Sequence, residues 1–221
     1  MKISRNSYPC LFRLTVYIRI HKRNKNGFCG AYKRVSGNLI ETHQQTKMTE
    51  IKIKKITLDD IDQLQKIGRQ TFYETFSTGN TEENMTKYLD EGFSDEKLTT
   101  ELNDKNAEFY FATLDENVIG YLKLNFGQSQ TELQDDKGLE IERIYVLKDF
   151  HGKSVGQLLY DKAIEIAKQK KSDYVWLGVW EENPRAINFY KKNGFVEFDK
   201  HIFKLGNDEQ TDIMMKLKLN N

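Results

Sequence analysis

Two glycines and a serine stand where a strand-like segment changes into a helix-like one. The segment "IYVLKDFHGKSVGQLLYDKA", residues 144–163, opens with β-branched and aromatic residues, and its apolar residues recur at helical spacing from Val155 onward. Gly152, Ser154 and Gly156 lie between these two patterns. Small residues let an anion approach the backbone closely, and the first turn of a helix presents N–H groups that lack intrahelical partners. The pattern favours a pyrophosphate-binding loop, and the alternative is an ordinary tight turn between a strand and a helix.

Three other glycine-containing sites fit the spacing poorly. A Walker loop requires Gly-Lys-Ser/Thr after a longer span, and a dinucleotide fingerprint requires an acidic residue about twenty positions further on, after a second strand. The pattern Gly-x-Ser-x-Gly also surrounds the nucleophile of some hydrolases. Here, however, Lys153 precedes the serine, and His201 is the only histidine downstream that could act as its base. The sequence therefore argues against each of these three sites.

Strand and helix patterns alternate around this loop from Met48 to the end of the chain. Period-two alternation or continuous apolar runs predict strands over 50–57, 139–146, 173–180, 195–205 and 210–219, and a β-hairpin over 107–127. Helical spacing and capping residues predict helices over 57–76, 81–93, 94–103, 153–171 and 183–194. Hairpins combined with β-α-β crossovers indicate a single α/β domain with a mixed sheet.

Particular residues mark the ends and the buried faces of these helices. Thr57 and Asn183 are expected at N-caps, Pro184 in a first turn, and Gly194 just after a helix end. In the helix that follows the glycine-containing loop, one apolar stripe is expected to be buried; it comprises Val155, Leu158, Leu159, Ala163, Ile166 and Ala167.

Two segments together carry a resemblance to a known family. The strand "IERIYV" followed by "HGKSVG" resembles the Q/R-x-x-G-x-G/A loop of the GNAT superfamily of acetyl-CoA-dependent N-acyltransferases, and "ENPRAINFYKKNGF" resembles its Asn and Tyr-x-x-x-Gly-Phe segment. The resemblance runs from Met48 to about Leu219, with His151 in place of Gln or Arg and Ser154 in place of the middle glycine. The segments "FYETFSTGNTEENM", "LEIERIYVLKDFHGK" and "DKHIFKLGNDEQTDIMMK" are also similar to bacterial PaiA-type spermidine/spermine N-acetyltransferases.

The resemblance implies a fold, a co-substrate and a set of binding residues. The fold is α/β, a mixed and mostly antiparallel twisted sheet flanked by helices, and the co-substrate is acetyl-CoA, without a metal. The cofactor-binding residues implied are Ile144, Tyr145 and Val146 along the pantetheine, Gly152, Lys153, Ser154, Val155, Gly156 and Gln157 at the pyrophosphate, Asn183 at the pantetheine, Tyr190 near the sulfur and Lys192 near the nucleotide. The structural alternatives are a helix cap for Asn183, a core aromatic for Tyr190 and a solvated lysine for Lys192.

Acetyl transfer to an amine requires a base and an acid. An alkylammonium with a pKa of about 10.4 must lose a proton before it attacks, and Glu140 and Glu142, two positions apart on one strand, point to the same face. We expect one of them to take this proton, directly or through water, unless both lie on a solvated strand face. The Tyr190 hydroxyl is the expected proton donor to the thiolate that leaves. Transfer should be direct, because no cysteine follows Met48.

The charge of the chain divides at Met48. Residues 1–47 hold ten of the 34 basic residues and one of the 33 acidic residues, a net charge of +9, so the remaining residues carry 24 bases and 32 acids, a net charge of −8. We expect residues 1–47 to be a basic extension that is disordered or not native, and 48–221 to be the acetyltransferase domain. The apolar run "CLFRLTVYIRI" is interrupted by Arg13 and Arg19 and is too short to span a bilayer, so a cytoplasmic protein is expected.

Net acidity of the domain favours a cationic acceptor, because a cleft of one sign raises the local concentration of the opposite charge. Together with the similarity to PaiA-type enzymes, which implies a polyamine such as spermidine or spermine as the small-molecule substrate, this makes a polyamine the expected acceptor, with no nucleic-acid or membrane partner. The sequence is compatible with a homodimer. Two alternatives remain: a different acceptor, such as the α-amine of a protein or another small amine, and a non-enzymatic regulator that keeps the fold.

Overall fold

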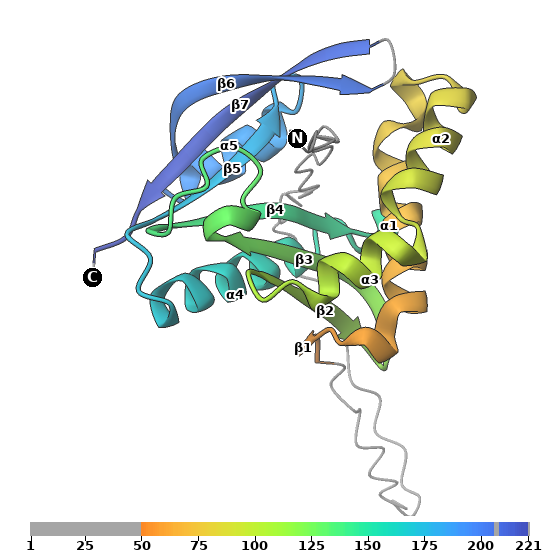
Figure 1. Ribbon diagram of the computed structural model, residues 1–221, viewed down its shortest axis with the longest axis horizontal. Helices are drawn as coiled ribbons and strands as arrows, with labels where there is room; N and C mark the ends of the chain where they lie inside the picture. Colours follow the sequence, from red (N-terminus) through yellow and green to blue (C-terminus); the bar gives the residue numbers. More distant parts are fainter. Residues whose placement is uncertain (1–49, 206–207, 221) are drawn as a thin grey trace, which may run out of the picture.

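The computed structural model describes residues 50–205 and 208–220, and Figure 1 shows how their helices and strands are arranged. The α-helices in these residues are α1 (Ile61–Phe76), α2 (Glu82–Gly92), α3 (Asp95–Asn103), α4 (Val155–Gln169) and α5 (Pro184–Lys192). The strands are β1 (Lys52–Lys55), β2 (Ala107–Leu114), β3 (Asn117–Phe126), β4 (Gly138–Val146), β5 (Tyr174–Trp180), β6 (Val196–Leu205) and β7 (Asp208–Lys218). The expected alternation of strands and helices is thus confirmed.

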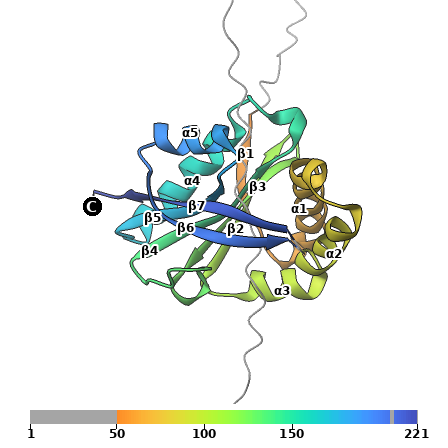
Figure 2. The ribbon, with the colours of Figure 1, turned by 90° about the horizontal axis from the view of Figure 1, so that it is seen from above.

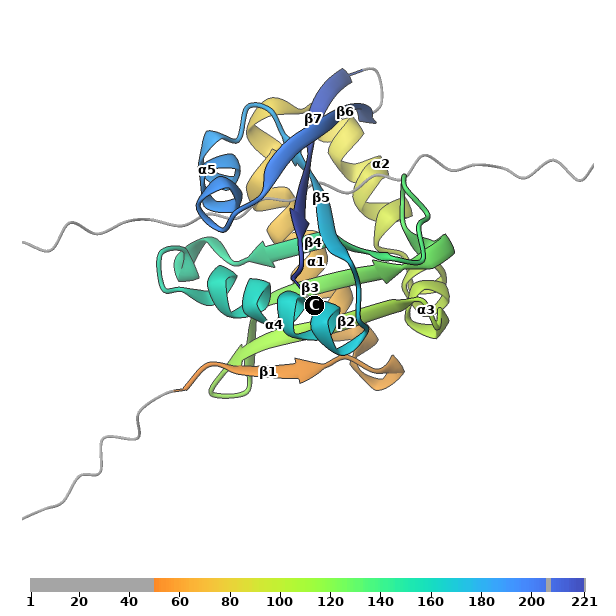
Figure 3. The same cartoon turned by 90° about the vertical axis from the view of Figure 1, so that its left-hand side faces the viewer.

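The seven strands form one open sheet in the order β1-β2-β3-β4-β5-β7-β6. Every neighbouring pair is antiparallel except β4 and β5, which are parallel and are connected through α4. This parallel pairing covers only Gly138 to Glu140 on β4 and Tyr174 to Trp176 on β5. Beyond those three pairs the two strands separate, and in Figure 3 β6 and β7 lie at the top of the sheet and β1 at the bottom. The predicted mixed, mostly antiparallel sheet flanked by helices is confirmed.

Helices cover both faces of the sheet, and each face has its own apolar core (Figure 2). On one face α4 and α5 pack on the strands through residues such as Val155, Leu159 and Ile187. On the other face α1, α2 and α3 contribute Leu64, Phe72 and other apolar side chains, among them a stacked Phe72–Tyr88 pair with ring centroids 4.1 Å apart. The sheet is therefore the middle layer of three, as expected for an α/β domain.

Local sequence signals set the ends of most elements. Thr81 and Ser94 cap α2 and α3 by accepting hydrogen bonds from backbone N–H groups three residues on. Thr57 forms a capping box with Asp60 ahead of α1. Gly194 follows α5 with φ of +89°, a left-handed conformation that glycine adopts without strain. The caps of α2 and α3 and the glycine after α5 confirm those predicted helix ends. The helix predicted over 57–76 was wrong at its start: Thr57 caps a 3-10 turn over Leu58–Asp60, and α1 begins at Ile61.

Two predictions about α4 were wrong in detail. The helix begins at Val155 and not at Lys153, because Gly152 and Ser154 adopt φ of +78° and +61° and so interrupt right-handed winding. Leu158, expected in the buried stripe, is 37% exposed. At 100° per residue Leu158 lies about 110° from the middle of the stripe, so it falls at the edge of the apolar face.

The expectation that residues 1–47 form a separate basic extension concerns residues outside the described ones. Among the helices of residues 50–205 and 208–220, none combines the length and apolar character needed to span a lipid bilayer.

Candidate active site

The separation of β4 from β5 opens a cleft at the carboxyl ends of both strands. It has a volume of about 680 Å³, within the range of about 300–1,000 Å³ typical of small-molecule sites. Val146 at the end of β4 and Trp180 at the end of β5 lie on its two sides. The remaining lining residues come from the end of α1 and the turn after it, from the loops after β4 and β5, and from β7; they are Glu74, Thr75, Phe76, Thr78, Gly79, Asn80, Lys148, His151, Glu181, Glu182, Gln210 and Thr211.

The loop between β4 and α4 borders this cleft through Lys148 and His151 and leads into the N-terminus of α4. The first hydrogen bond of α4 joins the Leu158 N–H to the Ser154 carbonyl at 3.1 Å. The N–H groups of Val155, Gly156 and Gln157 therefore precede the helical ladder and are available to an anion at the positive end of the helix. Ser154 holds its left-handed conformation at this point, which costs a residue with a Cβ about 1–2 kcal/mol.

His151 stands next to this loop and lines the cleft. Its Nε2 lies 2.7 Å from the Val146 carbonyl oxygen, so this nitrogen carries the hydrogen and donates it. Burial lowers the pKa of His151. The hydrogen bond to Val146 raises this pKa, and the charge of Arg185 lowers it, so that the net shift is downward. The imidazole is therefore a neutral side chain near pH 7 that fixes the end of β4.

The three β4 residues expected along a pantetheine lie where the strand has lost its partner. Ile144 and Val146 point to the core under α4 and α5, and Tyr145 points to the opposite core, where its ring stacks on Tyr121 at 5.7 Å. The β5-facing edge of this part of β4 has no strand partner in the described part of the chain. On its other edge Gly120 of β3 permits close approach, because a Cβ there would meet the Tyr145 carbonyl oxygen at 2.7 Å. The arrangement leaves an extended backbone edge facing the opening.

Glu140 and Glu142 lie on the same face of β4, as predicted, but the expected alternative of a solvated strand face was wrong. Their exposed fractions are 3% and 4%, and both point to the side of α1, α2 and α3. A β-bulge explains how β4 carries them: Arg143 pairs with Lys123 and Ile141 with Leu124, so Glu142 is the extra residue. The bulge brings Arg143 to the same side as the two glutamates.

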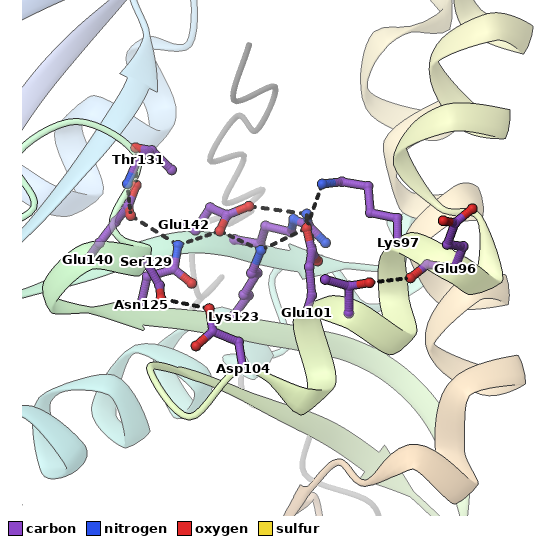
Figure 4. A network of polar contacts seen from close by, with 12 residues as sticks. Glu96, Lys97, Glu101, Asp104, Lys123, Asn125, Ser129, Thr131, Glu140 and Glu142 are labelled. Carbon is purple, nitrogen blue, oxygen red and sulfur yellow. Dashed lines mark hydrogen bonds and ion pairs between the residues drawn. The ribbon is translucent and has the colours of Figure 1, made fainter. Parts of the chain in front are cut away.

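Glu142 is surrounded by positive charge. Its Oε2 lies 2.7 Å from the Lys123 ammonium, and its Oε1 lies 3.1 Å from the Arg143 guanidinium. Both cations also contact Glu101 of α3, at 3.1 and 3.3 Å. Although burial raises the pKa of Glu101, the Arg143 and Lys123 charges lower it to about 2. Figure 4 shows this chain of contacts, which continues through Asn125 to Glu140.

Among the described residues, the hydrogen-bond partners of Glu140 are all neutral. Its carboxylate accepts hydrogen bonds from the Thr131 N–H at 2.8 Å, from the Thr131 hydroxyl and from the Asn125 amide at 3.1 Å. Burial and the nearby charge of Glu142 raise the pKa of Glu140 to about 7. Both glutamates line a second, small cavity of about 30 Å³, together with His201 of β6 and Asp212 of β7. That volume is enough for one water molecule, and Glu140 is a carboxyl group able to exchange a proton near neutral pH.

Tyr190 of α5 is completely buried in the core under α4 and α5. Its ring packs against Phe189 and Phe195 with centroids 5.2 and 5.3 Å away, while its hydroxyl has no hydrogen-bond partner among the described residues. Burial raises the pKa of Tyr190 well above its ordinary value, so the hydroxyl keeps its proton. Tyr190 shares this core with Ile144 and Val146 but is not part of the cleft lining.

The two remaining predicted residues lie on α5 as well. The Asn183 Oδ1 accepts a hydrogen bond from the Ala186 N–H at 3.1 Å, so this oxygen caps the helix. Lys192 is the last residue of α5, and its side chain is exposed and not among the residues lining the cleft. The structure therefore brings the strand end, His151 and the helix N-terminus together, and leaves Lys192 apart.

Several residues of the site were not predicted as site residues, although Glu74 and Phe76 lie in the segment "FYETFSTGNTEENM", which carries part of the resemblance. Glu74 and Phe76 at the end of α1 reach the cleft through tertiary packing, and the Phe76 ring lies 6.5 Å from that of Trp180. Glu74 also accepts a hydrogen bond from the Lys148 N–H at 2.9 Å. For the buried ion pairs one signal was present: Lys123 and Asn125 interrupt the mostly apolar run "VIGYLKLNF", and Lys123 marks a charge inside a buried strand.

Comparison with known proteins agrees with this geometry. Residues 67–195 match the acetyltransferase (GNAT) family. An N-acetyltransferase encoded in the pepI 3' region of Lactobacillus delbrueckii subsp. lactis is 40% identical over 172 residues, covering 78% of this chain and 99% of the relative. A spermidine N(1)-acetyltransferase of Thermoplasma acidophilum is 27% identical over 172 residues, covering 76% of this chain and 97% of that protein.

A solved structure gives the same result for the fold. The crystal structure of the PaiA N-acetyltransferase from Thermoplasma acidophilum in complex with coenzyme A superposes with a TM-score of 0.64 and 26% identity, covering 77% of this chain and 99% of that one. Sequence and fold thus agree over the domain that holds the cleft, the helix N-terminus and the buried tyrosine. The chain belongs to the acetyltransferase (GNAT) family and is an N-acetyltransferase.

Proposed function

We propose that this N-acetyltransferase takes the acetyl group from acetyl-CoA and transfers it directly to a primary amine of a polyamine. The observation that carries the choice of acceptor is the composition of the cleft. Three carboxylates line it, Glu74, Glu181 and Glu182, against the single ammonium of Lys148. Two aromatic rings, Phe76 and Trp180, lie among them. Carboxylates and aromatic faces both attract alkylammonium groups, and a polyamine carries several such groups on an apolar chain.

Acetyl-CoA fits the features at the other end of the cleft. Its pyrophosphate would lie against the N–H groups of Val155, Gly156 and Gln157, and its pantetheine along the unpaired edge of Ile144 to Val146. The buried Tyr190 hydroxyl, which has no partner among the described residues, supports a bound group on this side of the opening. When bound, acetyl-CoA supplies the acetyl group as an activated thioester.

Glu140 is the better candidate for the base of the two glutamates. Its pKa of about 7 lets it accept a proton near neutral pH, whereas Glu142 is occupied by Lys123 and Arg143. The small cavity beside Glu140 and the main cleft are lined by consecutive residues of β7, Asp212 and Thr211 respectively. A water molecule in the small cavity would carry the proton from the acceptor amine to the carboxylate.

Tyr190 would supply the proton that the departing thiolate requires. Its raised pKa keeps the hydroxyl protonated throughout the neutral range, as a general acid needs. The Val146 N–H on the open edge of β4 would stabilise negative charge on the thioester oxygen during the reaction, since the N–H groups of Leu147 and Lys148 already donate to Ile119 and Glu74. In this scheme the chain forms no covalent intermediate, since residues 48–221 contain no cysteine.

An assay of coenzyme A thiol release over a panel of amines tests the proposed acceptor. We expect kcat/KM to be highest for spermidine or spermine, lower for a monoamine of equal length and lowest for a peptide α-amine. Because the preference is electrostatic, it should weaken between about 0.1 and 1 M salt, as the Debye length falls from about 10 to about 3 Å. Higher rates on peptide α-amines, or a preference that salt leaves unchanged, would move the assignment to the α-amine of a protein.

A charge-neutral variant in the cleft sharpens this test. Glu182→Gln removes one exposed carboxylate of the cleft and should raise KM for spermidine several-fold, on the order of 0.5–1 kcal/mol, with KM for acetyl-CoA unchanged. Glu165→Gln, an exposed glutamate on α4 outside the cleft lining, is the matched control and should leave both values unchanged. Equal effects of the two substitutions would count against an acidic acceptor site.

A further inference from the structure

One amide group joins the two buried glutamates of β4. The Asn125 Nδ2 donates to the Oε2 atoms of both Glu140 and Glu142, at 3.1 and 2.5 Å. The two oxygens are therefore no more than about 5.6 Å apart, the sum of those distances. At such separations in a buried site, two like charges interact strongly, and one carboxylate takes up a proton more readily because the other is charged.

The surroundings decide which glutamate stays charged. Lys123 and Arg143 lie within 3.1 Å of Glu142, whereas in the described part of the chain the donors to Glu140 are the neutral Thr131 and Asn125. Nearby cations favour an ionised carboxylate, so the negative charge rests on Glu142 and the mobile proton on Glu140. The raised pKa of Glu140, about 7, agrees with this division.

The charge balance of the cluster points the same way. Lys123 and Arg143 face Glu101 and Glu142, two cations against two anions, all with side chains at most 13% exposed. Lys97 joins this cluster from α3 through Glu101, but its side chain is 41% exposed. An ionised Glu140 would add a third buried anion. Its protonation therefore returns the buried part of the cluster to neutrality.

The β-bulge is what makes this arrangement possible. Without an extra residue, alternation along β4 would send Arg143 to the α4 side of the sheet, opposite Glu140 and Glu142. With the extra residue at Glu142, Arg143 turns to the same side, and the next residues resume alternation, with Ile144 and Val146 under α4.

From these contacts we infer that Lys123, Arg143 and Glu142 are positioning residues: the two cations keep Glu142 charged, and charged Glu142 keeps Glu140 basic enough to take the proton of the acceptor amine at neutral pH. This inference rests on the proposed function. It assigns Glu142 a supporting role and leaves the proton transfer to Glu140.

Other titratable groups face Glu140 from other elements. Glu132 comes from the loop after β3, His201 from β6 and Asp212 from β7, and the His201 Nδ1 lies 3.1 Å from the Glu132 carboxylate. These groups stay in place when Glu142 or Lys123 is replaced. If the acid limb of the pH profile moves in opposite directions in the two variants, the shift is therefore attributable to the charges of Glu142 and Lys123 beside Glu140.

The experiment is the pH profile of kcat/KM for the best amine, measured on the full chain and on two variants. Glu142→Gln removes the negative charge beside Glu140, so the acid limb should move to lower pH by on the order of one unit. Lys123→Met removes a positive charge and keeps the apolar stem, while Arg143 still holds Glu142 ionised, so Glu140 experiences a more negative surrounding and the acid limb should move to higher pH. Glu165→Gln, on the opposite face of the sheet, is the control and should not move it.

Opposite shifts support the inference, because a loss of packing would not reverse sign between the two variants. Shifts in the same direction, or no shift in either variant, would overturn it. Glu140→Gln separates this outcome from a failure of the proposed base: a variant that keeps more than a third of the parent kcat/KM shows that Glu140 is not the base. The pH dependence of the thermal midpoint, measured on the same variants without substrate, should then still show the two opposite shifts.

Discussion

Replacement of Tyr190 by phenylalanine should slow catalysis and stabilise the ligand-free protein at the same time. The substitution keeps the ring that packs between Phe189 and Phe195 and removes only the hydroxyl. That hydroxyl is buried without a hydrogen-bond partner among the described residues, a condition that costs about 1–3 kcal/mol for a polar group. Its removal should therefore raise the free energy of unfolding by about 1 kcal/mol or more, a gain of about 2–4 °C in the melting temperature of a protein of this size.

The kinetic effect has the opposite sign. A general acid typically contributes a factor of about 10²–10⁴, which corresponds to about 3–5 kcal/mol in the activation barrier. Tyr190→Phe should reduce kcat by this factor and leave the affinity for acetyl-CoA nearly unchanged, the pattern of a group that acts mainly in the transition state. Coenzyme A thiol release gives kcat, and a thermal melt without ligand gives the stability.

Tyr160 provides the matched control. It lies in the same core, on α4, and its ring also contacts Phe189 and Phe195, so Tyr160→Phe removes a neighbouring hydroxyl and keeps the packing of the ring. Its kcat should stay within about threefold of the parent value, the spread expected of a substitution away from the reaction. If Tyr190→Phe lowers kcat by less than threefold, Tyr190 is not the general acid. If it lowers the melting temperature, the interpretation of the Tyr190 hydroxyl as a buried group without a hydrogen-bond partner is wrong.

Four further predictions concern the loop, the base and the extension. Ser154→Gly relieves a left-handed serine and should raise the free energy of unfolding by up to about 1 kcal/mol, as chemical denaturation would show. Gly156→Ile should weaken acetyl-CoA binding at least tenfold, about 1.4 kcal/mol by calorimetry, and unchanged affinity would refute the pyrophosphate site. Glu140, with a pKa raised from 4.5 to about 7, keeps its proton in the folded state after the unfolded chain has lost it, so it lowers stability progressively as pH rises through that window. Glu140→Gln should therefore melt higher than the parent above pH 7, with the difference vanishing towards pH 4. A chain that begins at Met48 should melt within about 2 °C of the full chain, and a larger loss would show that residues 1–47 contribute to the fold.

The features that could be predicted from the sequence are those that depend on neighbours along the chain. Thr81, Ser94 and Gly194 mark helix ends through bonds or dihedral angles within a few residues, and the "LDEN" hairpin closes over Asp115 and Glu116, both with positive φ. The glycine-containing loop belongs to the same class, since it is a strand end joined to a helix start.

The cleft itself depends on tertiary structure. Nothing local in β4 or β5 shows that their pairing stops after three residues, and nothing local in α1 shows that Glu74 and Phe76 line one cleft with Trp180. The β-bulge at Glu142 could not be predicted from the sequence of β4 either, because a shift of register depends on how the strand pairs with β3. As a result period-two alternation placed Glu140 and Glu142 on one face correctly and gave no sign that Arg143 joins them.

The early end of the β4–β5 pairing also has a thermodynamic consequence. The facing edges of Ile141 to Val146 and Leu177 to Trp180 are backbone edges without a strand partner in the described residues. For a ligand that enters between them, hydrogen bonds to peptide groups would contribute more to binding than the burial of apolar surface. Binding dominated by hydrogen bonds shows a large favourable enthalpy, whereas a large negative heat-capacity change marks apolar burial. Titration calorimetry of acetyl-CoA should accordingly show binding driven by enthalpy, with a heat-capacity change that is small for the size of the ligand.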